Sequence, residues 1–214
     1  MLIDLRVEGR RVLILGGGSV GERKARKFLQ ENSQVIVVSR SFTEELESLG
    51  RRGRVKLIRS GIEPDSPLIG SLISESFVVV AATDDRRLNE EIAAKAKEQG
   101  ALLSVVDEPS LSDFYMPATT RLGEIRVAIC TGGRSPAVSR ILRERIERLI
   151  TREDILQVEL QDYARRLVKS RVPDREARRR IIYRIIHDPE IKHLLREGNF
   201  EEAKSLAKRI IEHQ

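Results

Sequence analysis

The sequence predicts an α/β fold: a parallel β-sheet domain, then a small hairpin-plus-helix segment, and finally a C-terminal helical domain. Short segments rich in Val, Ile and Leu recur in the first half of the chain, and their apolar residues are mostly continuous rather than alternating. This pattern is typical of strands that are buried on both faces of a sheet. The predicted strands are Arg11–Leu15, Gln34–Val38, Val55–Ile58, Phe77–Ala81 and Leu102–Val106.

Segments of helical periodicity lie between these predicted strands. Apolar residues recur at helical spacing in Val20–Gln30 and in Arg87–Glu98, and Ser66–Ser74 is a candidate for a shorter helix. Strands that alternate with helices favour an open parallel sheet with right-handed crossovers.

The pattern changes after the last of these strands. Asp113–Thr120 and Ile125–Cys130 flank a predicted turn over residues 121–124, which indicates an antiparallel hairpin. The Ser135-Pro136 pair that follows is typical of a helix start, because proline lacks only an N–H that would be unpaired there. We expect this helix to run to Leu149.

The chain from Thr151 onward is helical by its pattern, with breaks near Pro173, Pro189 and the Gly198-Asn199 pair. We therefore expect a sheet domain over residues 1–112, a hairpin-plus-helix segment over 113–150 and a helical domain over 151–214.

The chain is basic, with 39 Lys and Arg against 33 Asp and Glu and a formal net charge of +6. The excess is spread along the chain, there is no Trp, and aromatic residues make up only 4%. These features argue against nucleic-acid binding, which would need stacking surfaces or a concentrated basic region. The densest basic run, Arg175–Arg184, is interleaved with isoleucines, so it is either the solvated face of a helix or a patch for an anionic ligand.

The sequence also predicts where the protein works. No apolar run approaches the roughly 18–20 residues that cross a membrane, and the first residues do not follow the pattern of a secretory signal. The chain has one cysteine and so no internal disulfide, which fits a reducing compartment. We expect a cytoplasmic protein without membrane association, in which Cys130 is a small buried residue.

A glycine-rich loop follows the first predicted strand: Gly16-Gly17-Gly18-Ser19-Val20-Gly21, which satisfies G-x-G-x-x-G. In this context Gly16 permits a tight turn, Gly18 lets the backbone approach a pyrophosphate, and Gly21 allows the helix to pack closely on the strand. The helix N-terminus adds free N–H groups and a positive dipole. The loop predicts a Rossmann-like dinucleotide-binding domain, and the alternative is a turn whose glycines serve packing alone.

The usual acidic residue is absent from the end of the second predicted strand. Dinucleotide-binding domains usually place Asp or Glu there, where it accepts hydrogen bonds from the ribose hydroxyls. This chain has Ser39-Arg40-Ser41 instead. Arg40 suits either a 2′-phosphate, which favours NADP, or a position over the adenine, and the local residues leave both open.

Asp107 follows the last predicted strand, at the sheet edge where ligands bind in open α/β folds. A carboxylate there suits proton transfer or the orientation of a metal ion, whereas the alternative is a turn-capping Asp before Glu108-Pro109. Thr83 and Asn89 follow the fourth predicted strand towards the same edge, and we expect them to shape the cleft or lie near the cofactor.

A second candidate anion site precedes the helix that starts at Pro136, and its residues are Thr131, Gly132, Gly133, Arg134 and Ser135. Backbone N–H groups and the Arg134 guanidinium suit a carboxylate, and a plain helix cap is the alternative. The histidines show no ligand-like spacing with Cys or carboxylates, so we expect solvated or half-buried helix residues and no metal site made by the protein. They are His187, His193 and His213.

Four phrases in order resemble the precorrin-2 dehydrogenase family: RVLILGGGSVGERKARKFL, VVVAATDDRRLN, SVVDEPSLSDFYMPA and VAICTGGRSPAVSRILRERIE. The resemblance covers Leu2 to about Ile150 well and the helical tail loosely. It implies NAD-dependent oxidation of precorrin-2 to sirohydrochlorin by a homodimer, in which the middle segment forms the dimer and the helical domain helps to cover the tetrapyrrole cleft. Related modules begin siroheme synthases, and some also act as ferrochelatases that insert Fe²⁺. Precorrin-2, a polycarboxylate, is an anionic partner that fits the basic charge.

The resemblance also implies roles for individual residues. It assigns catalysis to Asp107, with Ser104 in place of the family's Asn, and it sets Thr131 in place of a family serine. It implies NAD rather than NADP. The implied nucleotide contacts are Ser19, Val20, Arg40 and Ser41.

A different class of function is an NAD-binding regulatory module of an ion-transport system. Such modules share the glycine loop and a phrase like Thr83-Asp84-Asp85. They normally keep the strand-two carboxylate and lack both the Asp107 phrase and the GGRSP phrase, so the resemblance favours the enzyme.

Overall fold

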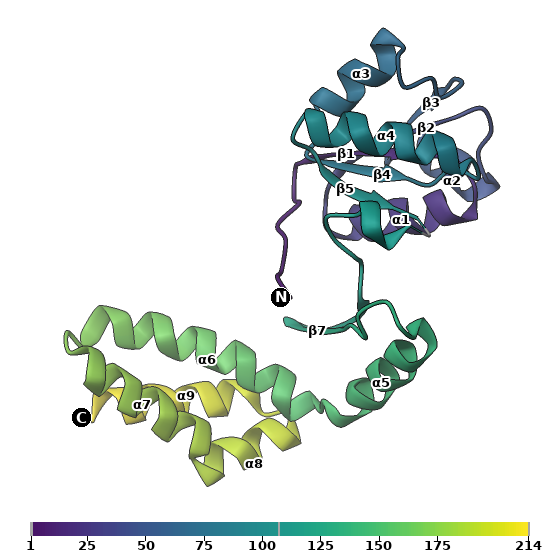
Figure 1. Cartoon of the computed structure of the whole chain (residues 1–214). Helices are drawn as coiled ribbons and strands as arrows, with labels where there is room; N and C mark the ends of the chain where they lie inside the picture. Colours follow the sequence, from purple (N-terminus) through teal and green to yellow (C-terminus); the bar gives the residue numbers. More distant parts are fainter. Residues whose placement is uncertain (1, 107, 214) are drawn as a thin grey trace. The chain divides into compact units, whose positions relative to one another are not determined.

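A computed structural model of the chain describes residues 2–106 and 108–213. The chain falls into two compact units, Met1–Met116 (the first unit) and Pro117–Gln214 (the second unit). Figure 1 shows the parallel sheet in the first unit and a group of helices in the second. Each unit has its own hydrophobic core. The finer division at residues 112 and 150 stays a prediction.

The first unit is built on a five-stranded parallel sheet with the strand order β3-β2-β1-β4-β5. From β1 the chain first adds strands on one side (β2 and β3) and then on the other side (β4 and β5). The switch point therefore lies between β1 and β4, as in the doubly wound sheets that bind dinucleotides. The Rossmann-like sheet that the sequence predicts is therefore confirmed. Its strands are β1 (Arg11–Leu15), β2 (Gln34–Ser39), β3 (Lys56–Arg59), β4 (Val78–Ala81) and β5 (Leu102–Val105).

Helices cover both faces of this sheet (Figure 1). One face, with Leu13 and Ile36, packs against α3 and α4. The other face, with Ile14 and Val37, packs against α1 and α2. Burial on both faces explains why the strands read as continuous aliphatic runs. The helices are α1 (Ser19–Gln30), α2 (Glu44–Arg51), α3 (Pro67–Ser74) and α4 (Arg86–Glu98), and η1 (Pro109–Leu111) is a short 3₁₀ turn.

Helix α2 is an element that the periodicity does not predict. Leu46 is fully buried and Leu49 packs against the same core, so the apolar stripe of this short helix consists of two residues. Its start is nevertheless specified locally, because the Thr43 hydroxyl accepts a hydrogen bond from the Leu46 N–H at 3.3 Å.

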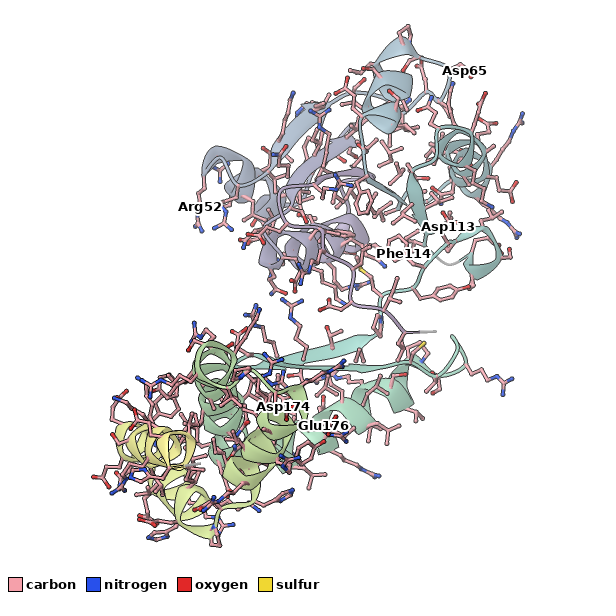
Figure 2. The ribbon with its side chains drawn as sticks, turned by 90° about the vertical axis from the view of Figure 1, so that its left-hand side faces the viewer. Arg52, Asp65, Asp113, Phe114, Asp174 and Glu176 are labelled. Carbon is pink, nitrogen blue, oxygen red and sulfur yellow. The ribbon has the colours of Figure 1, made fainter. Side chains whose placement is uncertain are left out.

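The exposed edge of β5 is satisfied by two side chains rather than by another strand. The Leu103 N–H donates to the Asp113 carboxylate and the Val105 N–H donates to the Ser112 hydroxyl, both at 2.9 Å. The Asp113 N–H donates in turn to the Leu103 carbonyl at 2.9 Å. Figure 2 labels Asp113 and Phe114 in this part of the first unit. Residues 113–117 are therefore not part of a hairpin strand, which corrects the predicted strand Asp113–Thr120.

The second unit begins with an antiparallel hairpin of β6 (Ala118–Leu122) and β7 (Ile125–Ile129). Gly123 takes the left-handed conformation that the tight turn requires, with φ of 59°. Helix α5 (Pro136–Leu149) contacts both strands, as its predicted position implies.

Cys130 is exposed, so the prediction of a buried cysteine is wrong. In the hairpin, side chains alternate between a half-buried face and an open face. Cys130 directly follows β7 in the register of Arg126 and Ala128, which are exposed, and so it continues the open face.

Four helices complete the second unit: α6 (Arg152–Arg171), α7 (Arg175–His187), α8 (Pro189–Glu197) and α9 (Phe200–Glu212). Their breaks fall where the prolines and Gly198 predict them. They enclose a core that includes Leu160, Ile185 and Leu195. His187 on α7, His193 on α8 and His213, directly after α9, are all exposed. Among residues 2–106 and 108–213, no helix is long and apolar enough to cross a membrane.

We expect Thr151→Ala to lower the free energy of unfolding by about 1 kcal/mol at neutral pH. Thr151 and Asp154 form a reciprocal capping box, in which the carboxylate accepts from the Thr151 N–H at 2.7 Å and from its hydroxyl at 2.8 Å. These bonds hold the pKa of Asp154 below its ordinary value. A depressed carboxyl pKa contributes stability above the unfolded-state pKa, which is lost as the pH falls through the folded-state pKa. The difference between variant and wild type should therefore shrink in acid.

Urea unfolding at neutral and acidic pH measures this effect. Lys169→Ala, at an exposed position on the same helix, is the control. An equal loss in the control, or a difference that grows in acid, contradicts the assigned role of the cap.

Candidate functional site

The site lies at the carboxyl edge of the sheet, where β1 and β4 end and their connections diverge. Gly16 has φ of 126°, and a Cβ on it would overlap the Ala82 carbonyl after β4. A Cβ on Gly17 would lie 2.8 Å from the Phe42 ring after β2. The Thr43 N–H also donates to the Gly17 carbonyl at 3.1 Å. Both glycines are therefore needed for the loop to fit between the chains that leave β2 and β4.

Gly18 has a different environment. A Cβ built on it meets no heavy atom within 4 Å, and the residue is exposed. It is also the N-cap of α1, with no side-chain hydrogen bond to the helix end. The first N–H groups of a helix have no acceptor within the helix, so those of α1 are available to a ligand.

Gly21 explains how close α1 comes to the loop. A Cβ there would overlap the Gly16 carbonyl and lie 3.6 Å from the Ile14 side chain. Packing alone thus accounts for Gly16, Gly17 and Gly21, but it does not account for the open space at Gly18. In dinucleotide-binding folds the backbone at this position approaches a pyrophosphate, which requires a residue without a side chain.

The end of β2 presents a cation rather than a carboxylate. Arg40 is exposed, and its Nε lies 3.5 Å from the position of a Cβ on Gly61, in the connection after β3. The Arg40 carbonyl accepts a hydrogen bond from Arg59 at 3.2 Å. Arg59 is itself paired with Glu47 and lies over the Phe42 ring at 5.2 Å. Sequence reasoning missed Phe42 and Arg59, whose signal is an aromatic and a basic residue at neighbouring strand ends.

Thr83 is held in place by Asn89. The Thr83 hydroxyl lies 2.7 Å from the Asn89 amide oxygen, and the Asn89 amide donates to the Thr83 carbonyl at 3.1 Å. Asn89 is buried on α4, with 6% of its surface exposed. Gly16, which contacts Ala82, and Thr83 thus lie at the same edge, so the structure brings Thr83 to the glycine loop.

We expect Asn89→Ala to destabilise the first unit by about 1–3 kcal/mol, because the half-buried Thr83 N–H then loses its acceptor. Unfolding in urea measures the loss. Glu98→Ala, at an exposed position of α4, is the control and should change stability little. Equal stabilities of the two variants contradict this role of Asn89.

The second predicted anion site forms a closed turn at the start of α5. The Ser135 N–H donates to the Thr131 hydroxyl at 3.1 Å, and the Val138 N–H donates to the Ser135 hydroxyl at 3.3 Å. Gly132 and Gly133 have φ of 63° and 78° and contact nothing at their Cβ positions. The helix cap is therefore present, and the binding of an anion there stays a prediction.

The predicted site residues fall into two groups. The glycine loop, Arg40, Ser41 and Thr83 lie at one edge of the sheet in the first unit. Thr131–Ser135 belongs to the second unit. Asp107 lies outside the described residues. Its neighbour Val106 donates a hydrogen bond to the Ala81 carbonyl at 2.9 Å, next to the end of β4.

Comparison with known proteins identifies the family. Residues 3–118 match the family described as "Putative NAD(P)-binding". The precorrin-2 dehydrogenase of Methanosarcina barkeri is 36% identical over 213 residues, which cover 99% of this chain and 92% of that protein. The chain belongs to the precorrin-2 dehydrogenase family.

Two further comparisons concern a larger relative and a solved structure. Siroheme synthase 1 of Aeromonas salmonicida is 32% identical over 96% of this chain, but the match covers 42% of that protein. The chain thus spans less than half of this larger relative. The solved structure of SirC, a precorrin-2 dehydrogenase, shares the fold with a TM-score of 0.75 over 98% of this chain, at 21% identity. The relatives from Methanosarcina barkeri and Aeromonas salmonicida favour the enzyme over an ion-transport module.

Proposed function

We propose that this chain is an NAD-dependent dehydrogenase that oxidises precorrin-2 to sirohydrochlorin in siroheme biosynthesis. The observation that carries the proposal is the open, uncapped start of α1 at Gly18, in a chain that aligns over nearly its full length with a precorrin-2 dehydrogenase. When bound, NAD accepts a hydride from the substrate.

Different residues of the first unit suit different parts of the cofactor. The backbone N–H groups of Ser19 and Val20 at the start of α1 suit the pyrophosphate. Arg40 and Ser41, both exposed after β2, suit the adenosine end. Thr83, fixed by Asn89, lies beside the loop on the β4 side.

Asp107 completes the reaction as a proton acceptor. Oxidation removes a hydride and a proton from precorrin-2, so the proton needs a base when the hydride leaves. The position of Asp107 in the sequence, directly after the segment that ends β5, supports this role. The turn at Thr131–Ser135 supports a second role for the chain, which is to hold a substrate carboxylate at Arg134. No ion pair of Arg134 occurs among the described residues.

The working assembly that we propose is a homodimer formed through α5. Val138, Ile141, Leu142 and Leu149 form a stripe along one side of α5, and their exposed fractions are 46%, 49%, 36% and 74%. An exposed apolar stripe on a helix marks an interaction surface. The lone exposed cysteine and the siroheme relatives support a cytoplasmic location.

We expect Ile141→Glu to convert the dimer into a monomer, because a carboxylate in the centre of the stripe would be buried without a partner. Size-exclusion chromatography with light scattering measures the mass. Arg140→Glu, on the opposite side of α5, is the control and should stay dimeric. A wild-type chain that is monomeric in solution, or an Ile141→Glu chain that stays dimeric, contradicts this interface.

The activity is tested by anaerobic incubation with precorrin-2 and NAD, while the formation of NADH and the sirohydrochlorin spectrum are followed. Turnover with NAD supports the proposal, and absence of turnover with both NAD and NADP contradicts it. A separate assay with Fe²⁺ and preformed sirohydrochlorin tests the predicted ferrochelatase activity, because chelation needs no oxidation step.

A further inference from the structure

A cavity of about 430 Å³ opens at the amino end of the sheet in the first unit, at the edge opposite the glycine loop. It is lined by the starts of β1, β2 and β3, by the connection before β3, and by the end of α3. None of the predicted site residues lines it. The residues that matter for its chemistry are Arg11, Ile36, Arg54, Lys56, Leu72 and Glu75.

Part of the cavity lining is apolar. Ile36 of β2 lies opposite Lys56 of β3, so both side chains are on the same face of the sheet. This is the face that α3 covers with Leu72. Ile36 and Leu72 are only 7% and 8% exposed, so they offer a ligand a small apolar surface at the base of the cavity, beside the polar residues Ser33 and Gln34.

The rim of the cavity carries an excess of positive charge. The single carboxylate, Glu75, is already occupied, because it pairs with Arg11 and accepts from the Ser71 hydroxyl at 2.9 Å. These hydrogen bonds, with a smaller effect of Lys56, hold the pKa of Glu75 below its ordinary value.

Arg54 and Lys56 differ from Arg11. They are exposed, and the described residues offer them no ion pair. Many other arginines of the first unit, such as Arg26, Arg59 and Arg86, do pair with carboxylates. On the rim, Arg54 therefore has no carboxylate partner among the described residues, and Lys56 has only the weak attraction of Glu75, which Arg11 already pairs with.

We propose that this cavity binds a small organic anion, with its phosphate or carboxylate between Arg54 and Lys56 and its apolar body over Ile36 and Leu72. Guanidinium and ammonium groups form the strong, charge-assisted hydrogen bonds that such anions need. β1 separates the cavity from the glycine loop by five residues, or about 15 Å at the rise of a strand. The cavity and the dinucleotide site can therefore be filled at the same time.

Isothermal titration with phenyl phosphate, in the presence of saturating NAD, tests the site. NAD occupies the glycine loop, which removes that competing anion site. We expect phenyl phosphate to bind to the wild-type chain at roughly 1 mM. Inorganic phosphate should bind more weakly, because it has no apolar body, and benzyl alcohol should not bind, because it has no charge.

The matched variants are Arg54→Glu with Lys56→Glu, and Arg52→Glu alone. Arg52 extends from the surface of the same region (Figure 2) and does not line the cavity. The double variant should bind phenyl phosphate roughly tenfold more weakly or worse. The Arg52→Glu variant should bind within about twofold of wild type, because an exposed charge outside the cavity is screened.

Three results overturn the proposal: no binding of phenyl phosphate to the wild type, equal binding to the double variant, or an equal loss in Arg52→Glu. Arg54→Gln with Lys56→Gln repeats the test without charge reversal if the first double variant unfolds. NAD affinity and turnover of precorrin-2 should stay at the wild-type level in all these variants. A chain without dehydrogenase activity would leave the phenyl phosphate result readable, so the two proposals fail separately.

Discussion

Asp107→Asn should lower the rate of precorrin-2 oxidation by about 10²- to 10⁴-fold while leaving NAD affinity unchanged. That range is the usual contribution of a general base, and an amide cannot accept the proton. The comparison separates the two roles that the sequence leaves open. Asn keeps the hydrogen-bonding shape of a turn-capping Asp, so a purely structural residue would tolerate it. Asp107→Ala should lose activity to a similar degree.

The measurements are steady-state turnover with precorrin-2 and NAD, and a direct titration of NAD by fluorescence. Thermal unfolding checks that both variants fold. Near-normal turnover of Asp107→Asn returns this residue to a capping role, and a lost NAD affinity in both variants shows that Asp107 acts on the cofactor instead.

Gly18→Asp should weaken NAD binding by roughly a hundredfold without unfolding the chain. A side chain at Gly18 meets no protein atom within 4 Å, and its φ of −79° is accessible to any residue, so the free protein accommodates the change. The new carboxylate stands where the pyrophosphate would approach, and it repels that group. Loss of two charge-assisted hydrogen bonds is about 3 kcal/mol, which corresponds to this factor.

Gly70→Asp is the matched control, because Gly70 on α3 also meets nothing at its Cβ position but lies away from the loop. The wild type and this control should gain thermal stability when NAD is added, whereas Gly18→Asp should gain little. A Gly18→Asp chain that NAD stabilises as well as the wild type contradicts the placement of the pyrophosphate. Gly16→Ala is less informative, since a Cβ there overlaps the Ala82 carbonyl and disturbs the fold itself.

The parts of the fold that the sequence predicts are those with strong local signals. Unbroken aliphatic runs predict the buried strands. The Ser135 cap and Pro136 predict the start of α5. Helix α2 is not predicted because it is short and its apolar face consists of Leu46 and Leu49 alone. The first hairpin strand is mistaken in extent, because Asp113 is bound to Leu103 of the sheet, a contact between segments that no local pattern reveals.

The site divides in the same way. The glycine loop is predictable because each glycine has a local reason, and Thr83 is predictable from its place after β4. The contact of Gly17 with Phe42, and the bond between Arg59 and the Arg40 carbonyl, depend on which strands are neighbours. The cavity at the amino end of the sheet has no motif at all, since Arg11 and Lys56 come from separate strands.

The side chains of Ser112 and Asp113 occupy the hydrogen-bonding groups at the outer edge of β5. A full doubly wound sheet continues to a sixth strand beyond the fifth. Here a hydroxyl and a carboxylate take the hydrogen bonds that such a strand would have made with Val105 and Leu103. Two side chains cannot template a further strand, so this edge is closed to pairing with another chain, and it resists edge-to-edge aggregation. The parallel sheet therefore has five strands instead of six, and the residues that follow form the β6–β7 hairpin.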